Sequence, residues 1–125
     1  MKQYNWEKFT VLVAEDYEPS YQFIYEFLAL TKINILWAKD GHEAIDLSKK
    51  NKIDIILMDI KMPKLYGHNA LMEIKKQLGK IPAIATTAYA TKEYEKMCYE
   101  SGFDNYISKP IDINKLFKVM SEYLN

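Results

Sequence analysis

The sequence predicts a three-layer α/β sandwich with helices on both faces of a parallel five-stranded sheet. Short apolar runs recur roughly every 20–25 residues and alternate with amphipathic stretches at helical spacing. The apolar runs are mostly uninterrupted, which is typical of strands covered on both faces. The predicted strands span residues 10–14, 33–38, 53–58, 83–87 and 106–108.

The first two helices expected between these strands have clear start signals. Pro19 suits the first turn of the first helix, where a missing N–H costs nothing. The stripe of that helix expected to face the sheet is Phe23, Phe27 and Leu30, widened by Ile24 and Leu28. Asp40 and Glu43 resemble a capping box at the start of the second helix. Its apolar positions are Ala44, Ile45 and Leu47, beside exposed Asp46, Lys49 and Lys50.

The remaining helices follow the third, fourth and fifth strands. The apolar positions of the third helix are Ala70, Leu71 and Ile74. The fourth, residues 92–101, is the most polar, with its inward side expected at Tyr94, Met97 and Cys98. Gly102 then acts as a C-terminal stop. The fifth helix has its apolar stripe at Ile113, Leu116, Phe117, Met120 and Leu124.

Right-handed crossovers leave few strand orders for such a chain. The prediction is the flavodoxin-like, doubly wound order 2-1-3-4-5. Because no linker, repeat or low-complexity segment interrupts the sequence, we expect one domain over residues 1–125, with its core at residues 9–124 and no further output domain. In doubly wound sheets ligands bind outside the carboxyl ends of the strands, near the point where the strand order reverses.

Composition excludes several function classes. Formal net charge is zero, from 17 basic and 17 acidic residues, whereas a dedicated nucleic-acid binder shows a basic excess. All basic residues are lysines, so any cationic role falls to a lysine. Cys98 is the only cysteine, which excludes an intrachain disulfide and a cysteine-rich zinc site. No apolar run approaches the roughly 18 residues of a membrane span, and the N-terminus lacks the apolar core of a signal peptide.

Four of the five predicted strands end in charged or hydroxyl side chains. They are Glu15 and Asp16 after the first strand, Asp59 after the third, Thr87 at the fourth and Lys109 after the fifth. Crowded carboxylates stay ionised only beside a compensating cation, and Mg²⁺ prefers oxygen ligands, water and phosphate. An aspartate can also act as a nucleophile and form an aspartyl phosphate. The pattern therefore predicts a phosphoryl-accepting aspartate with a metal ion and a lysine that balances its charge.

Each of these residues also has an ordinary structural explanation when it is taken alone. Asp59 is a good turn residue, Thr87 a β-branched strand residue and Lys109 a surface lysine. Their convergence on one edge of the sheet favours the functional interpretation. Trp37, inside the second strand, and Cys98 are expected to serve packing.

The sequence resembles the response-regulator receiver domains of two-component signalling. The segments that carry the resemblance are VLVAEDYEPS, DIILMDIKMPKLYG, IPAIATTAYA and SGFDNYISKP. A single acidic pair or a Lys-Pro is weak, but four such segments in this order and spacing are highly specific. The last two segments are also similar to receivers attached to hybrid histidine kinases.

The resemblance implies a role for each matching position. Asp59 accepts the phosphoryl group, and Lys109, before a cis Pro110, contacts it. Thr87 swings toward the phosphoryl oxygen, and Tyr106 then rotates inward and reshapes the face formed by the fourth helix, fifth strand and fifth helix. The implied ligands of Mg²⁺ (or Mn²⁺) are Asp16, Asp59, the backbone carbonyl of Lys61, and Glu15 directly or through water.

Lys61 and Tyr89 border the route of the hydrolytic water in this family. We expect the two long side chains to shield the acyl phosphate, so that self-dephosphorylation is slow. The implied partner is a histidine kinase or a histidine phosphotransfer domain, and a homodimer would use the face of the fourth helix, fifth strand and fifth helix. No direct nucleic-acid or membrane contact is expected. The expected location is the cytoplasm, including the cytoplasmic part of a membrane-bound hybrid kinase.

Two alternative functions remain open at the level of sequence. One is an interaction module that works without phosphorylation. The other is a hydrolase of the haloacid-dehalogenase type, which needs a second aspartate where this chain has Lys61. A flavodoxin-like FMN site is disfavoured because the segment EDYEPS is acidic and lacks glycine. The expectation is therefore a non-enzymatic receiver that only phosphorylates itself from a donor and slowly loses the phosphate.

Overall fold

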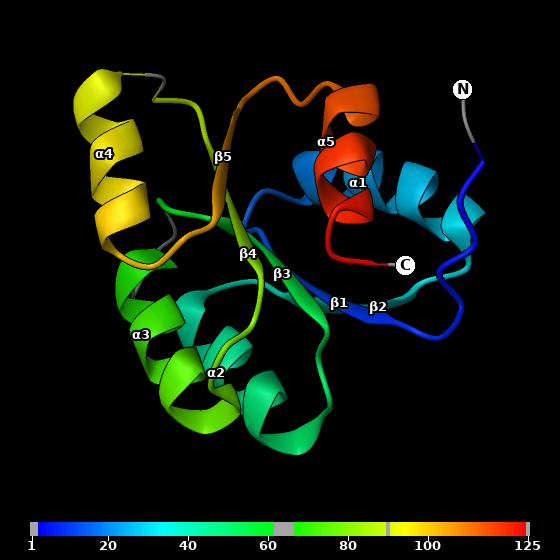
Figure 1. The fold of residues 1–125 in the computed structure, drawn as a ribbon, viewed down its shortest axis with the longest axis horizontal. Helices are drawn as coiled ribbons and strands as arrows, with labels where there is room; N and C mark the ends of the chain where they lie inside the picture. The colour runs from blue at the N-terminus through cyan, green and yellow to red at the C-terminus, as the bar shows by residue number, and fades with distance from the viewer. Residues whose placement is uncertain (1–2, 62–66, 90, 125) are drawn as a thin grey trace.

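Five parallel strands form one sheet in the order β2-β1-β3-β4-β5, as predicted (Figure 1). The computed structural model describes residues 3–61, 67–89 and 91–124. Residues 62–66, which follow Asp59 in the segment DIILMDIKMPKLYG, lie outside the described ranges. The strands are β1 (Thr10–Ala14), β2 (Asn34–Ala38), β3 (Ile55–Asp59), β4 (Ala83–Thr87) and β5 (Asn105–Ser108).

The third strand begins two residues later than predicted and includes Asp59. The side chain of Asp54 explains the late start, because its Oδ2 accepts a hydrogen bond from the Thr10 amide at 2.8 Å. The Asp54 amide in turn donates to the Thr10 carbonyl at 2.9 Å, so Asp54 joins β1 to the start of β3 through both its side chain and its backbone. At the other end, Asp59 pairs in register with Thr86 of β4. The predicted phosphoacceptor is thus held within the strand, not in the loop after it.

Helices cover both faces of the sheet. They are α1 (Glu18–Leu28), α2 (Gly41–Lys50), α3 (Gly67–Leu78), α4 (Lys92–Glu100) and α5 (Ile113–Ser121), with a short 3₁₀ turn η1 (Ala29–Thr31) after α1. Figure 1 shows α1 and α5 together on one side and α2 and α3 on the other. Alternate residues of β3 serve the two layers: Ile55 and Leu57 pack toward α1 and α5, and Ile56 and Met58 toward α2, α3 and α4. None of the described helices has the length and apolar character that a bilayer span requires.

The stripe predicted for the first helix was right for Ile24 and Leu28 but wrong for Phe23 and Leu30. Tyr21, Ile24 and Leu28 are the buried residues of α1, whereas Phe23 is 46% and Leu30 71% exposed. The tyrosine decides the orientation, because its ring stacks on Trp37 of β2 with the centroids 4.0 Å apart. Tyr21, an aromatic residue with a polar hydroxyl, therefore occupies the inward position on α1. Phe23 and Tyr25 are left exposed on the outer side of α1.

The start of α2 is a modified capping box. Asp40 Oδ1 accepts a hydrogen bond from the Glu43 amide at 2.9 Å, as predicted. Glu43 Oε1, however, accepts from the amide of Lys39 at 2.9 Å, one residue earlier than in the standard arrangement. Both bonds satisfy backbone donors at the turn from β2 into α2. They stiffen the loop next to the site described below.

Candidate functional site

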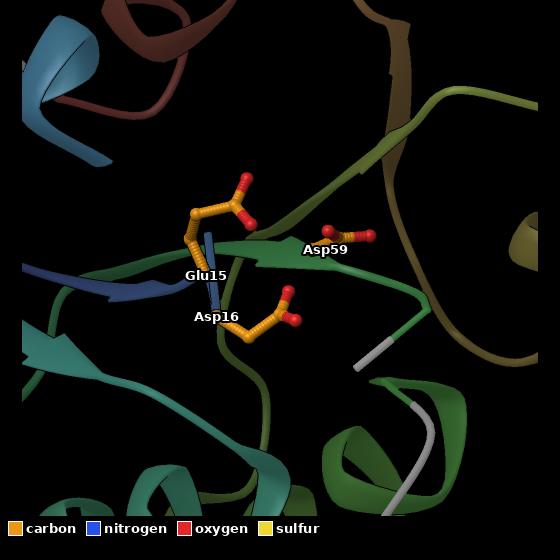
Figure 2. Close-up of side chains that lie close together, drawn as sticks. All are labelled: Glu15, Asp16 and Asp59. Atoms are coloured by element: carbon orange, nitrogen blue, oxygen red, sulfur yellow. The ribbon is translucent and has the colours of Figure 1, made fainter. Parts of the chain in front are cut away.

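Three carboxylates meet at the carboxyl ends of β1 and β3. Glu15 and Asp16 directly follow β1, and Asp59 ends β3, its neighbour in the sheet. One oxygen atom from each of the three side chains lies within 4.8 Å of the others. Figure 2 shows the three side chains around a common space beyond the strand ends. Glu15 and Asp59 are only 2% and 6% exposed, whereas Asp16 faces solvent.

Lys109 joins two of these carboxylates. Its Nζ lies 2.6 Å from Glu15 Oε1 and 3.0 Å from Asp59 Oδ2, and its side chain is 21% exposed. The backbone amide of Lys109 donates to the Thr87 carbonyl at 2.8 Å, which places the lysine at the end of β5. The Lys109–Pro110 peptide bond is cis. Sequence reasoning therefore named all four residues that the fold brings into this cluster.

Burial and ion pairing shift the pKa values of Glu15 and Lys109 in opposite directions. Burial raises the pKa of Glu15 above 4.5, and the hydrogen bonds from Lys109 and from the Tyr17 amide only partly oppose it. Burial alone would lower the pKa of Lys109, but the hydrogen bonds to Glu15 and Asp59 outweigh it and hold that pKa above 10.5. The ammonium is therefore charged at neutral pH. One ammonium facing three carboxyl groups leaves an acidic set of oxygen donors that fits a hard divalent cation.

Thr87 and Tyr106 both form hydrogen bonds with the backbone of Tyr89. Thr87 is fully buried, and its Oγ1 accepts a hydrogen bond from the Tyr89 amide at 3.0 Å. The hydroxyl of half-buried Tyr106 donates to the Tyr89 carbonyl at 2.5 Å. Both predicted switch residues therefore hold the backbone of Tyr89, one through its N–H and the other through its C=O. The positions of Thr87 and Tyr106 are therefore linked through the backbone of Tyr89.

Lys61 contacts both the acidic cluster and Tyr89. Its backbone amide donates to Asp59 Oδ1 at 3.0 Å. Its Nζ lies 4.3 Å from the centre of the Tyr89 ring, a cation–π distance. The Tyr89 ring in turn stacks on Tyr94 of α4, with the centroids 5.3 Å apart. The two predicted lifetime-tuning residues thus touch each other.

Trp37 is the residue of this site that sequence reasoning assigned only to packing. Its indole Nε1 donates to the backbone carbonyl of Glu15 at 2.9 Å. The bond joins β2 to the residue after β1, so it depends on the pairing of two strands. No motif or spacing in the sequence signals it.

Comparison with known proteins decides the family. The family model for the response regulator receiver domain matches residues 11–121. The chain belongs to the response-regulator receiver family. The receiver is 32% identical over 117 residues to the polar-differentiation response regulator DivK of Brucella anthropi, which covers 92% of this chain and 95% of that protein. It is 41% identical over 120 residues to the hybrid signal transduction histidine kinase I of Dictyostelium discoideum, covering 89% of this chain but 7% of that protein.

Solved receiver structures agree with the fold. The Francisella response regulator 1452 receiver domain superposes with a TM-score of 0.84 at 33% identity, over 91% of this chain and 94% of that one. The receiver domain of Ssk1 from Saccharomyces cerevisiae, solved together with the histidine phosphotransfer protein Ypd1, gives 0.84 at 26% identity, over 92% and 88%. The receiver is thus a signalling domain of two-component systems rather than a classical enzyme.

Proposed function

We propose that this receiver accepts a phosphoryl group from a phosphohistidine donor onto Asp59. The proposal rests on the position of Lys109 Nζ, which lies within hydrogen-bond distance of both Glu15 and Asp59. Asp16 lies at the same edge of the sheet. An oxygen of the Asp59 carboxylate attacks the phosphorus and forms an acyl phosphate. The P–N bond of the donor breaks, its electron pair returns to the imidazole nitrogen, and that nitrogen takes a proton from solvent.

The residues around Asp59 divide the remaining work. The ligands we assign to Mg²⁺ or Mn²⁺ are Glu15 (directly or through water), Asp16, Asp59 and the Lys61 carbonyl, and the cation would neutralise charge on the phosphoryl oxygens. Lys109 loses its Asp59 partner upon transfer and contacts a phosphoryl oxygen instead. Thr87 donates its hydroxyl hydrogen to another phosphoryl oxygen. Tyr106 then moves together with the Tyr89 backbone, and this movement reshapes the α4–β5–α5 face. We also place a homodimer contact on that face.

The test of this function is a mass measurement. The folded protein is incubated with Mg²⁺ and acetyl phosphate or phosphoramidate, and its intact mass is followed. We expect one added phosphoryl group. No adduct with either donor would favour an interaction module that works without phosphorylation, and steady release of many phosphates would favour a hydrolase.

We further propose that residues 9–124 act as one cytoplasmic receiver unit without direct nucleic-acid or membrane contacts. Its partner would be a histidine kinase or histidine phosphotransfer protein that docks on α1. In support, Tyr17 and Phe23 are exposed beside a cavity of about 280 Å³ that Lys109 and Pro110 also line. This apolar surface is therefore continuous with the lysine of the site. A helical donor packed there would bring its phosphohistidine to Asp59.

Substituting Phe23 on this surface tests the docking proposal. Phe23→Glu is expected to slow transfer from phosphorylated phosphotransfer proteins of the source organism by at least about tenfold, because a buried charge costs binding energy at an apolar contact. Labelling by acetyl phosphate should not change, since this small donor does not need the α1 surface for docking. Met72→Glu is the matched control, because Met72 is similarly exposed but lies on α3. Equal slowing by both variants would contradict docking on α1.

Lys61 and Tyr89 are proposed to prolong the phosphorylated state. Their contact would cover the space next to Asp59 through which water must approach. Lys61→Ala and Tyr89→Ala are each expected to speed phosphate loss about two- to fivefold, the range of one cation–π contact. This rate is measured by following the return of the phosphorylated protein to its unphosphorylated mass. Loss that is equal or slower in both variants would disprove shielding.

A further inference from the structure

The backbone of Glu15 is held by two consecutive residues of β2. Its amide donates to the Ala38 carbonyl at 2.9 Å, which extends the β1–β2 ladder by one bond. Its carbonyl accepts from the indole Nε1 of Trp37 at 2.9 Å. Since β2 ends at Ala38, a side chain supplies the donor for the next carbonyl along β1.

The peptide that Trp37 holds is the one between the two acidic residues. The carbonyl of Glu15 and the amide of Asp16 belong to one rigid plane. Fixing the carbonyl therefore restrains the Cα atoms of both Glu15 and Asp16, from which the two acidic side chains extend. Their carboxylates, together with that of Asp59, make up the acidic cluster in Figure 2.

Trp37 is itself held in place for this bond. Its ring is parallel to that of Tyr21 of α1, with an interplanar angle of 2° and a centroid distance of 4.0 Å. Lys39 Nζ lies 4.9 Å from the centre of the Trp37 ring. The indole cannot rotate without losing these contacts, so its N–H is aimed at Glu15 before any cation binds. Packing alone would be satisfied by an aromatic ring without an N–H.

We propose that Trp37 is a positioning residue for the divalent-cation site, acting through the peptide between Glu15 and Asp16. The inference rests on the proposed function of that site. Preorganised ligands bind a cation more tightly because less motion is lost upon binding. Without the indole N–H, the peptide plane turns more freely and the acidic pair is less well placed.

Binding of Mn²⁺ to the full chain, followed by the EPR signal of the free ion, is the first test. Trp37→Phe keeps a ring for Tyr21 but has no donor. It is expected to weaken Mn²⁺ binding about two- to tenfold, the range that one hydrogen bond supplies. Trp6→Phe is the matched control, because Trp6 is buried before the amino end of β1, away from the acidic residues. It should bind Mn²⁺ as the wild type does.

An isostere separates the hydrogen bond from packing. In the Trp6→Phe background position 37 is the only tryptophan, so 3-benzothienylalanine can be incorporated there alone. This residue has the shape of tryptophan with sulfur in place of N–H. We expect it to bind Mn²⁺ as weakly as Trp37→Phe does. Wild-type affinity for the isostere would show that ring size matters and would overturn the proposal.

Nuclear magnetic resonance gives a second readout. The protein has two tryptophans and therefore two indole N–H signals. Titration with Mg²⁺ is expected to shift the Trp37 signal and leave that of Trp6 unchanged, whereas equal behaviour of both would contradict the proposal. No Mn²⁺ binding by the wild type would refute the cation site itself. Wild-type binding with equal affinity in Trp37→Phe would refute only the role of Trp37.

Discussion

Asp59→Asn is expected to abolish the phosphoryl adduct completely. An amide is too weak a nucleophile to attack phosphorus, although it keeps the size of the carboxyl group and an oxygen to accept the Lys61 amide. The intact mass after incubation with Mg²⁺ and acetyl phosphate should therefore show no added phosphoryl group. Circular dichroism would verify that the variant is folded.

Asp46→Asn is the matched control for this experiment. Asp46 is an exposed carboxylate on α2, remote from the acidic cluster, so its loss should leave the adduct unchanged. An adduct that persists in Asp59→Asn at the wild-type level would assign the phosphoryl group to another residue. It would thereby refute the proposed function.

Lys109→Met is expected to have the largest effect on stability. Without Mg²⁺, it should lower the free energy of unfolding by about 2–4 kcal/mol, because removing one partner of a buried ion pair leaves the other charge uncompensated. Glu15 and Asp59 are both left behind, since Lys109 is the ion-pair partner of each of these buried carboxylates among the described residues. Added Mg²⁺ should recover part of the loss, because it supplies the missing positive charge. Urea unfolding with and without Mg²⁺ measures both effects.

A surface lysine provides the comparison. Lys76 forms an ion pair with Glu73 at 3.0 Å, but their side chains are 66% and 49% exposed. Lys76→Met should therefore change the free energy of unfolding by less than about 1 kcal/mol. A similar loss of unfolding free energy in both variants would mean that Lys109 stabilises the protein no more than a surface lysine does.

The contribution of Lys109 also depends on pH. Its pKa is higher in the folded protein than the ordinary 10.5, so the stabilisation is fully present below pH 10.5. It is lost as the pH rises through the folded pKa and the ammonium releases its proton. The stability difference between wild type and Lys109→Met should therefore narrow above pH 10.5. A constant difference across that window would contradict the ion-pair explanation.

Local patterns were enough to predict most of the fold. Uninterrupted apolar runs located all five strands to within two residues, and crossover handedness predicted their order. The carboxyl ends of parallel strands share one edge, so the convergence of Glu15, Asp16, Asp59 and Lys109 followed from the order alone. The outer face of α1 was not predictable in this way. Phe23, Phe27 and Leu30 match helical spacing as well as Tyr21, Ile24 and Leu28 do.

The sequence by itself determined which side chains stand at the strand ends, because strand boundaries and charge are properties of short segments. Only the tertiary structure decided which contacts those side chains make. Stacking of Tyr21 on Trp37 set the orientation of α1, and the pairing of β1 with β2 brought the Trp37 indole to Glu15. Likewise, Lys61 reached Tyr89 only because β3 and β4 are neighbours. Such contacts join residues distant in sequence, and their geometry depends on packing that no single segment encodes.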